Sequence, residues 1–244
     1  MKIICVIPAR YKSSRFPGKP LADIHGKPMI WWVYRRAAQV PDFAQVLVAT
    51  ADGRIMDACK SLDMPCILTS DAHPTGTDRV GEVASRVPAD LYVNVQGDEP
   101  LISPATIFRA IDPSRAADPP EVTNLMTEIK KTSDLASATV PKVVTNARGD
   151  AMYLSRSAVP FPKDPIGVRY FKQVCVYGFT PASLAFFCAH ADKGPAERAE
   201  DIELLRFIEH GIRVRMLEVE QDTVAVDTPS DLKIVRGLLE GEKP

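Results

Sequence analysis

Runs of apolar residues alternate with helix-like patterns along the first hundred positions of the chain. Continuous apolar runs, which are typical of strands covered on both faces, occupy residues 3–7, 44–50, 65–68 and 89–95. Apolar positions at helical spacing fall between them, over residues 28–39, 54–62 and 80–87. Strands and helices that alternate in this way predict an α/β fold with a doubly wound, mostly parallel, Rossmann-like sheet.

The pattern changes after residue 100, where prolines accumulate. A helix is predicted over residues 102–111, and residues 113–137 are proline-rich and weakly patterned. We therefore predict one domain over residues 1–244 with a subdomain inserted at about 113–180. The later elements are expected to be two strands within 142–156, a strand at 172–179, helices at 181–190 and 195–210, a strand at 213–219 and a helix from 229 to about 239.

Composition limits the classes of function. The net charge of -1 over 244 residues gives no general electrostatic reason to bind nucleic acid or a membrane surface. The five scattered cysteines contain no Cys-x-x-Cys pair and indicate reduced thiols, so we expect a cytoplasmic protein. The four histidines lack metal-ligand spacing, and we expect neither a signal peptide nor a membrane span. Neither a P-loop nor a Gly-x-Gly-x-x-Gly motif is present.

A basic loop follows the first strand. It begins at Pro8 and carries four cations without an acidic residue, namely Arg10, Lys12, Arg15 and Lys19. Cations at the carboxyl end of a buried parallel strand are typical of an anion site at the sheet edge. Prolines 17 and 20 restrict the backbone around Lys19, so its side chain should be held in place. The alternative is a solvated surface loop, which charge alone would favour.

Two further stretches carry candidate chemistry. The strand at 89–95 runs into Gln96-Gly-Asp98, which places a carboxylate at the same sheet edge as the basic loop. A carboxylate beside a polyphosphate calls for Mg²⁺, so Asp98 is a candidate metal ligand, with an Asx turn as the alternative. Gly76 would let the backbone approach a ligand, and Thr77 is expected to cap the helix over 80–87.

Residues 7–21, 26–30 and 94–100 resemble, nearly residue for residue, the sugar-activating cytidylyltransferases that use 3-deoxy-manno-octulosonate (Kdo). The stretch 226–232, Val-Asp-Thr-Pro-Ser-Asp-Leu, resembles the same family. The resemblance implies a nucleotidyltransferase-type fold and transfer of CMP from CTP to the anomeric hydroxyl of a ketosugar acid, with release of pyrophosphate, for lipopolysaccharide biosynthesis. It also implies that the protein forms a homodimer and uses Mg²⁺ as cofactor. Its expected small-molecule partners are CTP and a small ketosugar acid.

The resemblance assigns roles to individual residues. Catalysis is expected from Arg10, Arg15, Lys19 and Asp98, and metal binding from Asp98 and Asp227. Nucleotide binding is expected from Pro8, Ala9, Arg10, Lys19, Gly76, Thr77, Arg79 and Gln96. Sugar binding is expected from Arg156, Gln173, Tyr177 and Glu203.

The chain departs from the family pattern at residues that should contact the sugar. Gln173 stands where the family usually has His, and Leu204 where it has Gln. If a sugar hydroxyl were still buried beside one of these positions, the loss of its hydrogen-bond partner would weaken binding by about 1–3 kcal/mol. A modified substrate would explain the two replacements. We hypothesise an 8-amino analogue of Kdo, with Glu200 or Asp201 facing the amine.

Other functions remain open at this point. A CMP-nonulosonate synthetase would use similar motifs. A glycosyltransferase that consumes a nucleotide sugar would be expected to carry Asp-x-Asp, which Asp98-Glu99-Pro100 lacks. A non-catalytic nucleotide-binding module would not need two carboxylates.

Overall fold

The computed structural model describes residues 1–13, 15–164, 167–220 and 224–242. Its helices and strands form two compact units, Met1–Phe108 with Thr223–Pro244 and, separately, Arg109–Asp222. The second unit contains the segment predicted to be an insertion and extends beyond it at both ends.

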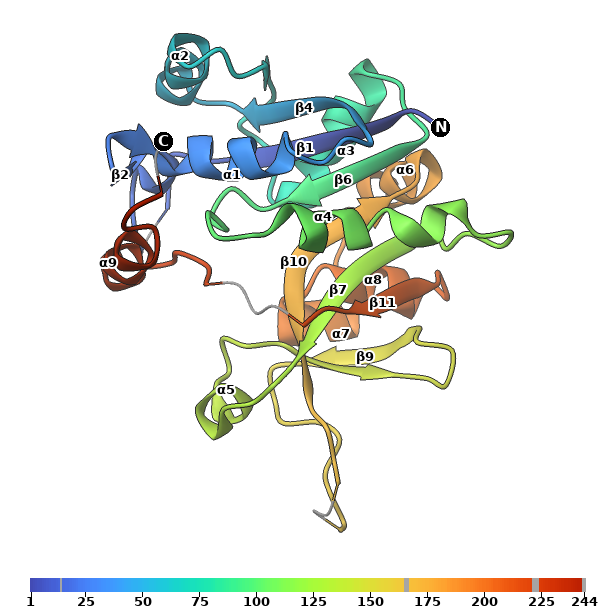
Figure 1. Cartoon of the computed structure of the whole chain (residues 1–244). Helices are drawn as coiled ribbons and strands as arrows, with labels where there is room; N and C mark the ends of the chain where they lie inside the picture. Colours follow the sequence, from blue (N-terminus) through green and yellow to red (C-terminus); the bar gives the residue numbers. More distant parts are fainter. Residues whose placement is uncertain (14, 165–166, 221–223, 243–244) are drawn as a thin grey trace. The chain divides into compact units, whose positions relative to one another are not determined.

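Strand β1 (Ile3–Ala9) is central in the parallel sheet of the first unit (Figure 1). It pairs with β4 (Phe43–Thr50) on one side and β6 (Leu91–Val95) on the other, and β5 (Cys66–Leu68) pairs with β4. The chain therefore builds the sheet outward from β1 to β5 and then returns to place β6 on the opposite side of β1. This reversal confirms the doubly wound prediction, and it marks the edge where ligands bind in such sheets.

Five helices accompany this sheet: α1 (Met29–Ala37), α2 (Gly53–Ser61), α3 (Gly76–Arg86), α4 (Pro104–Arg109) and α9 (Pro229–Leu238). In Figure 1, α1 crosses in front of β1 and α3 lies behind the sheet. Helix α1 buries an apolar stripe, because residues three or four apart lie on one helical face. Helix α3 buries Val80 and Val83 together with polar residues of its first turn. A short 3-10 helix, η1 (Lys19–Leu21), and a hairpin of β2 (Asp23–Ile24) and β3 (Lys27–Pro28) connect β1 to α1.

The C-terminal helix packs onto the start of the chain. Val226 and Leu232 join Met29 and Trp32 in one buried apolar cluster. The indole nitrogen of Trp32 donates a hydrogen bond to Ile24 O at 3.0 Å, which satisfies its polar group inside the cluster. This packing brings the segment just before α9 to the loop after β1.

The second unit contains a mixed sheet. Strand β7 (Val122–Glu128) pairs in parallel with β11 (Val214–Glu218) and antiparallel with β10 (Phe171–Phe179). The hairpin of β8 (Lys142–Thr145) and β9 (Ala151–Ser155) joins this sheet through β8, which pairs with β10. The remaining elements of this unit are η2 (Asp112–Arg115), α5 (Thr132–Ala136), α6 (Pro181–Ala189), α7 (Pro195–Glu200) and α8 (Leu204–Glu209).

The single helix predicted over residues 195–210 is wrong, because the chain breaks into α7 and α8. Asp201 ends α7 in the left-handed conformation, with φ of 52°. The break lets Arg206, 2 % exposed, pair with the fully buried Glu197 at 2.7 Å. Nine residues span about 13 Å along one straight helix, so this ion pair needs the chain to fold back. The buried pair therefore explains the break.

Two other predictions are corrected. Strand β7 was not expected, because its Thr123, Asn124 and Thr127 interrupt the apolar pattern, yet all three are buried. Helix α3 begins four residues earlier than expected, and its cap is Thr75, whose hydroxyl accepts the amide of Asp78 at 3.2 Å. Thr77 lies inside the first turn and is not the cap.

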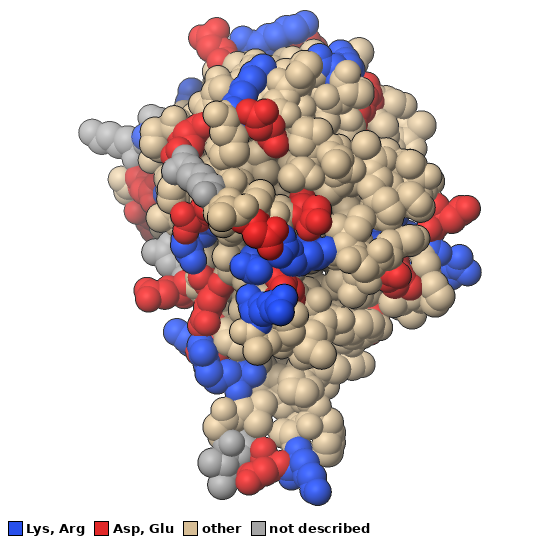
Figure 2. All heavy atoms as spheres, turned by 90° about the vertical axis from the view of Figure 1, so that its right-hand side faces the viewer, with Lys and Arg blue, Asp and Glu red and all other residues tan. Residues whose placement is uncertain are grey.

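Charges of both signs are mixed on the surface. Figure 2 shows basic and acidic side chains interspersed over the described atoms of the visible face. Within the described residues, no helix combines the length and the apolar character that a membrane span requires.

Candidate active site

The loop after β1 is held by contacts within the first unit. Gly18 has φ of 73°, a left-handed conformation that favours glycine, and its amide donates to Tyr11 O at 2.9 Å. A Cβ at Gly18 would lie 3.1 Å from the Tyr11 ring, so a larger residue would displace the ring. Arg54, on α2, covers the same ring with its guanidinium. Lys19 then begins η1 directly after this fixed turn.

Lys19 is the centre of a charged cluster in the first unit. Its Nζ lies 2.7 Å from Asp98 Oδ2 and 3.2 Å from Asp227 Oδ1. Arg15 contributes a second cation, with Nη1 3.2 Å from Asp227 Oδ2. Lys19 is only 14 % exposed, whereas Arg15 is 60 % exposed, so Lys19 makes the less screened contacts. The structure thus brings together four predicted site residues from three distant parts of the sequence.

The two aspartates reach Lys19 from different elements. Asp98 follows the carboxyl end of β6, and its carbonyl accepts the amide of Val226 at 2.9 Å. Asp227 precedes α9, whose N-terminus is capped by Thr228 and Asp231. Burial raises the pKa of Asp231, but hydrogen bonds from Thr228 and the backbone amide of Asp227 outweigh it, so the pKa lies below its usual value. Asp231, rather than Asp227, therefore caps the helix, and the Asp227 carboxylate pairs with Lys19 and Arg15.

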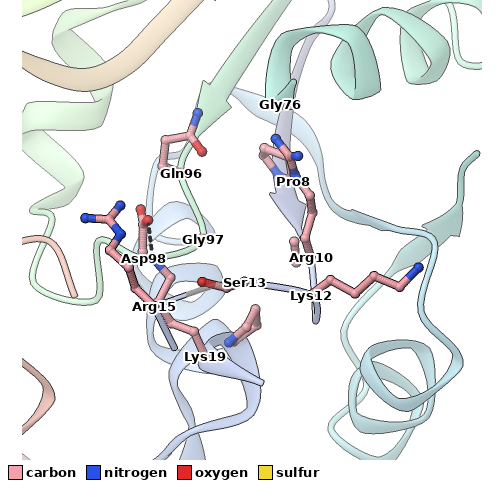
Figure 3. A pocket seen from close by; sticks show the side chains of 12 residues that line it. Pro8, Arg10, Lys12, Ser13, Arg15, Lys19, Gly76, Gln96, Gly97 and Asp98 are labelled. Carbon is pink, nitrogen blue, oxygen red and sulfur yellow. Dashed lines mark hydrogen bonds and ion pairs between the residues drawn. The ribbon is translucent and has the colours of Figure 1, made fainter. Parts of the chain in front are cut away.

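A cavity of about 350 Å³ opens beside this cluster (Figure 3). In Figure 3, Asp98 and Arg15 lie on one side of the cavity, and Arg10 lies on the other. The lining residues are Pro8, Ala9, Arg10, Lys12, Ser13, Arg15, Lys19, Pro20, Gly76, Gln96, Gly97 and Asp98. Every residue predicted to bind nucleotide therefore lines this cavity except Thr77 and Arg79.

Two glycines in the lining of this cavity have little room for a side chain. A Cβ at Gly97 would lie 3.0 Å from the backbone oxygen of Pro8, which is too close for any other residue without movement of the strand ends. A Cβ at Gly76 would meet Gln96 and Pro8 at 3.4 Å, at the limit of ordinary contact. The role of Gly97 was missed from the sequence, although its place at a strand end is a signal of close backbone approach.

Arg79 and Thr77 lie behind the cavity wall. Both side chains are buried, at 1 % and 2 % exposed. Arg79 Nη1 donates to Thr69 Oγ1 and to Ser70 O, so it ties α3 to the segment after β5. Burial, together with the nearby Arg10 cation, lowers the pKa of Arg79. Arg79 also lines a second cavity of about 330 Å³, which shares Arg10 with the first.

Asp98 and Asp227 are suitable ligands for Mg²⁺. This ion prefers hard oxygen ligands and commonly takes one or two carboxylates together with waters and substrate phosphates. Both carboxylates already converge on one cation, the ammonium of Lys19. Among the described residues no group of three or more His, Cys, Asp or Glu side chains is arranged to hold a metal. A site built on this pair would be completed by water or by phosphate oxygens of a substrate.

A smaller cavity, with a volume of about 150 Å³, lies in the other unit. It is lined by Pro141, Arg156, Gln173, Tyr177, Asp201, Ile202 and Glu203. All four residues predicted to bind the sugar are present in this lining. Gln173 and Tyr177 both come from β10, and Gln173 Nε2 lies 3.4 Å from the Tyr177 hydroxyl.

Arg156 is held rigidly at this pocket of the second unit. Its guanidinium donates to three backbone carbonyls, those of Ala138, Glu200 and Asp201, at 2.9, 2.5 and 3.2 Å. These acceptors are neutral carbonyls, so the three hydrogen bonds do not neutralise the positive charge of the guanidinium. The side chain can therefore also attract an anionic ligand.

Two expectations about this pocket are corrected. Glu200 does not line it, because one carboxylate oxygen accepts the Ser155 hydroxyl at 2.6 Å and the other accepts the amide of Arg156 at 2.8 Å. Leu204 is 1 % exposed and belongs to the core, so this position provides no polar side chain that could hydrogen-bond to a sugar hydroxyl. Asp201 does line the pocket, although its carboxylate is paired with Lys193.

Replacing Glu200 by glutamine should lower the free energy of unfolding by about 2 kcal/mol at pH 7, since the two hydrogen bonds are made to a charged acceptor. Burial raises the pKa of Glu200, but these hydrogen bonds outweigh it and set the pKa below the usual 4.5. A depressed carboxyl pKa gives stability that is present above the usual pKa and lost as pH falls through the folded value.

The difference between the two proteins should therefore shrink at acidic pH, as measured by urea unfolding between pH 7 and pH 3. Glu240→Gln, at an exposed position, is the control and should change stability little at any pH. A difference that stayed constant with pH would contradict the assignment.

The chain resembles known cytidylyltransferases over nearly its whole length. A family model described as cytidylyltransferase matches residues 4–216. Similar proteins include the 3-deoxy-manno-octulosonate cytidylyltransferases of Geobacter metallireducens, 44 % identical over 98 % of both chains, and of Escherichia coli, 42 % identical over 99 % of this chain and 97 % of that one. A solved CMP:2-keto-3-deoxy-manno-octonic acid synthetase complexed with CTP superposes with a TM-score of 0.94 at 42 % identity, over the full length of both chains.

Proposed function

Because the chain belongs to the cytidylyltransferase family, we propose that it transfers CMP from CTP to the anomeric hydroxyl of Kdo or a close analogue and releases pyrophosphate. The observation that carries the proposal is the cluster of Lys19 with Asp98 and Asp227 beside the 350 Å³ cavity. The full-length similarity to enzymes named for Kdo supports the choice of sugar acid.

The first unit would bind CTP. Arg10, Arg15 and Lys19 would hold the triphosphate and stabilise the charge that moves to the leaving pyrophosphate. Gly76 and Gln96 face the same cavity, which supports a role in holding the cytidine. Asp98 and Asp227 would hold Mg²⁺, which when bound neutralises phosphate charge and lowers the pKa of a coordinated hydroxyl.

The second unit would bind the sugar acid. Arg156 offers a fixed cation to the carboxylate of the ketosugar, because its guanidinium is positioned by three carbonyls. Gln173, Tyr177 and Glu203 would contact the hydroxyls. A pyrophosphate-release assay with CTP and Kdo tests the activity, and a protein that releases none with any ketosugar acid would refute it.

Substrate preference should reflect the altered pocket. Gln173 replaces the usual histidine, and Asp201, on the pocket wall, carries a carboxylate that pairs with Lys193 and that an amine of the substrate would contact in its place. We therefore expect 8-amino-Kdo to be used with a higher kcat/KM than Kdo, by about tenfold, since one charged contact contributes on the order of 1–2 kcal/mol. The kcat/KM values for a panel of ketosugar acids that includes a nonulosonate test this preference. A clear preference for plain Kdo would refute the 8-amino-Kdo hypothesis.

The setting of the enzyme is also proposed. The five cysteines form no disulfide, which supports a location in the reducing cytoplasm. Met152 and Phe161 are large apolar side chains that are 58 % and 89 % exposed, and they support a homodimer formed through this part of the second unit. Such an enzyme would activate the sugar for lipopolysaccharide.

A further inference from the structure

Strand β10 carries a two-residue bulge where it faces β7. Val174 lies opposite Leu125, but the next paired residue is Tyr177, which lies opposite Asn124. Residues 175 and 176 are therefore extra on β10. Because two residues are inserted rather than one, side chains beyond the bulge keep their original face of the sheet.

The bulge brings Gln173 and Tyr177 together. In a regular strand these residues would be separated by four residue rises, about 13 Å. In β10 their partners on β7 are Met126 and Asn124, only two residues apart, or about 7 Å along the sheet. This shortening lets Gln173 Nε2 come within 3.4 Å of the Tyr177 hydroxyl, and it places both side chains in the wall of one small pocket.

The side chain of Asn124 holds the bulge. Its Nδ2 donates to the carbonyl of Val174, just before the inserted stretch, and to that of Val176, the last inserted residue, at 2.9 and 2.8 Å. Asn124 is fully buried, and its Oδ1 has no hydrogen-bond partner among the residues that the structure describes. An amide buried with one group unsatisfied destabilises a fold, so an apolar residue would suit a plain strand better here. Its two donors are matched to the two carbonyls of the bulge.

We propose that Asn124 is a positioning residue of the sugar-acid pocket: by holding the β10 bulge, it sets the spacing of Gln173 and Tyr177 and thereby the affinity for the ketosugar acid. This inference rests on the proposed function of that pocket. Asn124 does not line the pocket, so its effect passes through the two β10 side chains.

The test compares Asn124→Ser with wild type and with Thr123→Val. Serine keeps one donor but cannot span both carbonyls. Thr123 is the matched control, because it is the adjacent buried residue of β7 and loses one hydrogen bond, to Ala110 O at 2.8 Å, outside the bulge. If Asn124→Ser does not fold, Asn124→Thr serves in its place.

Two measurements are made on each full-length protein. Steady-state kinetics should show the KM for the ketosugar acid raised about tenfold in Asn124→Ser, the KM for CTP changed less than twofold, and both constants within twofold in Thr123→Val. Nuclear Overhauser contacts between the Gln173 side-chain amide and the Tyr177 ring, in selectively labelled protein, should weaken strongly in Asn124→Ser only.

The outcomes separate the two hypotheses. Loss of the Gln173–Tyr177 contact with an unchanged KM would support the role of Asn124 in holding the bulge and refute the assigned sugar role of the pair. Retention of the contact in Asn124→Ser would overturn the inference, whatever the kinetics. Equal increases in both KM values would likewise overturn it, because they would indicate a general loss of structure.

Discussion

Lys19→Ala should lower kcat/KM for cytidylyl transfer by about a thousandfold, or about 4 kcal/mol of transition-state stabilisation, while the fold stays intact. The ammonium is 14 % exposed and lies within 3.2 Å of both aspartates, so little water screens its charge. In the proposed reaction this charge would face the triphosphate as negative charge moves to pyrophosphate. Pyrophosphate release as a function of CTP concentration, at fixed sugar acid, gives kcat/KM and measures the loss, and circular dichroism checks the fold.

Lys12→Ala provides the comparison. It removes the same charge from the same loop, but Lys12 is 81 % exposed and pairs with Asp71 at 2.8 Å. We expect its effect on kcat/KM to stay under tenfold, since exposed ion pairs contribute little. Similar losses in the two variants would show that only the total charge of the loop matters, and would contradict the specific role of Lys19.

Asp98→Ala should abolish the Mg²⁺-dependent reaction, again with a loss of about a thousandfold or more. Removal of one of the two carboxylates would leave Asp227 as the single protein ligand, so Mg²⁺ would be held by Asp227, phosphate oxygens and water. The measurement is pyrophosphate release as a function of Mg²⁺ concentration, at fixed CTP. We expect the variant to need much more Mg²⁺ and to remain slow when saturated.

Asp71→Ala is the matched control, because Asp71 is 69 % exposed and its ion pair is with Lys12 rather than Lys19. It should leave the Mg²⁺ dependence close to that of wild type. Release of pyrophosphate by Asp98→Ala at the wild-type rate would refute the metal assignment.

The first unit could largely be predicted from the sequence, because its strands are continuous apolar runs that alternate with helix-like patterns. The run at 3–7 became β1, and the loop after it carries the expected cations. The meeting of Asp227 with Lys19 could not be derived from spacing, since 208 residues separate them. It required the family resemblance, and in the structure it depends on apolar packing of α9.

The second unit could be predicted less well, because its buried polar residues conceal the usual patterns. Strand β7 was missed since the donor groups of Asn124 and Thr123 are paired with non-local carbonyls, which a local pattern does not reveal. The helix break at Asp201 was missed for a similar reason: it serves the buried pair of Arg206 and Glu197. The four residues predicted to bind the sugar nevertheless line one pocket, whereas Glu200, hypothesised to face an amine, makes structural hydrogen bonds instead.

The contribution of the last segment of the chain bears on when the protein becomes competent during its synthesis. During synthesis, the loop after β1 and the end of β6 leave the ribosome before Asp227 does, and a domain generally folds as a unit. Asp227 and the helix that anchors it follow much later along the chain. A nascent or prematurely terminated polypeptide would thus carry the triphosphate-facing cations without the second carboxylate. We expect such fragments to bind nucleotide without turning it over.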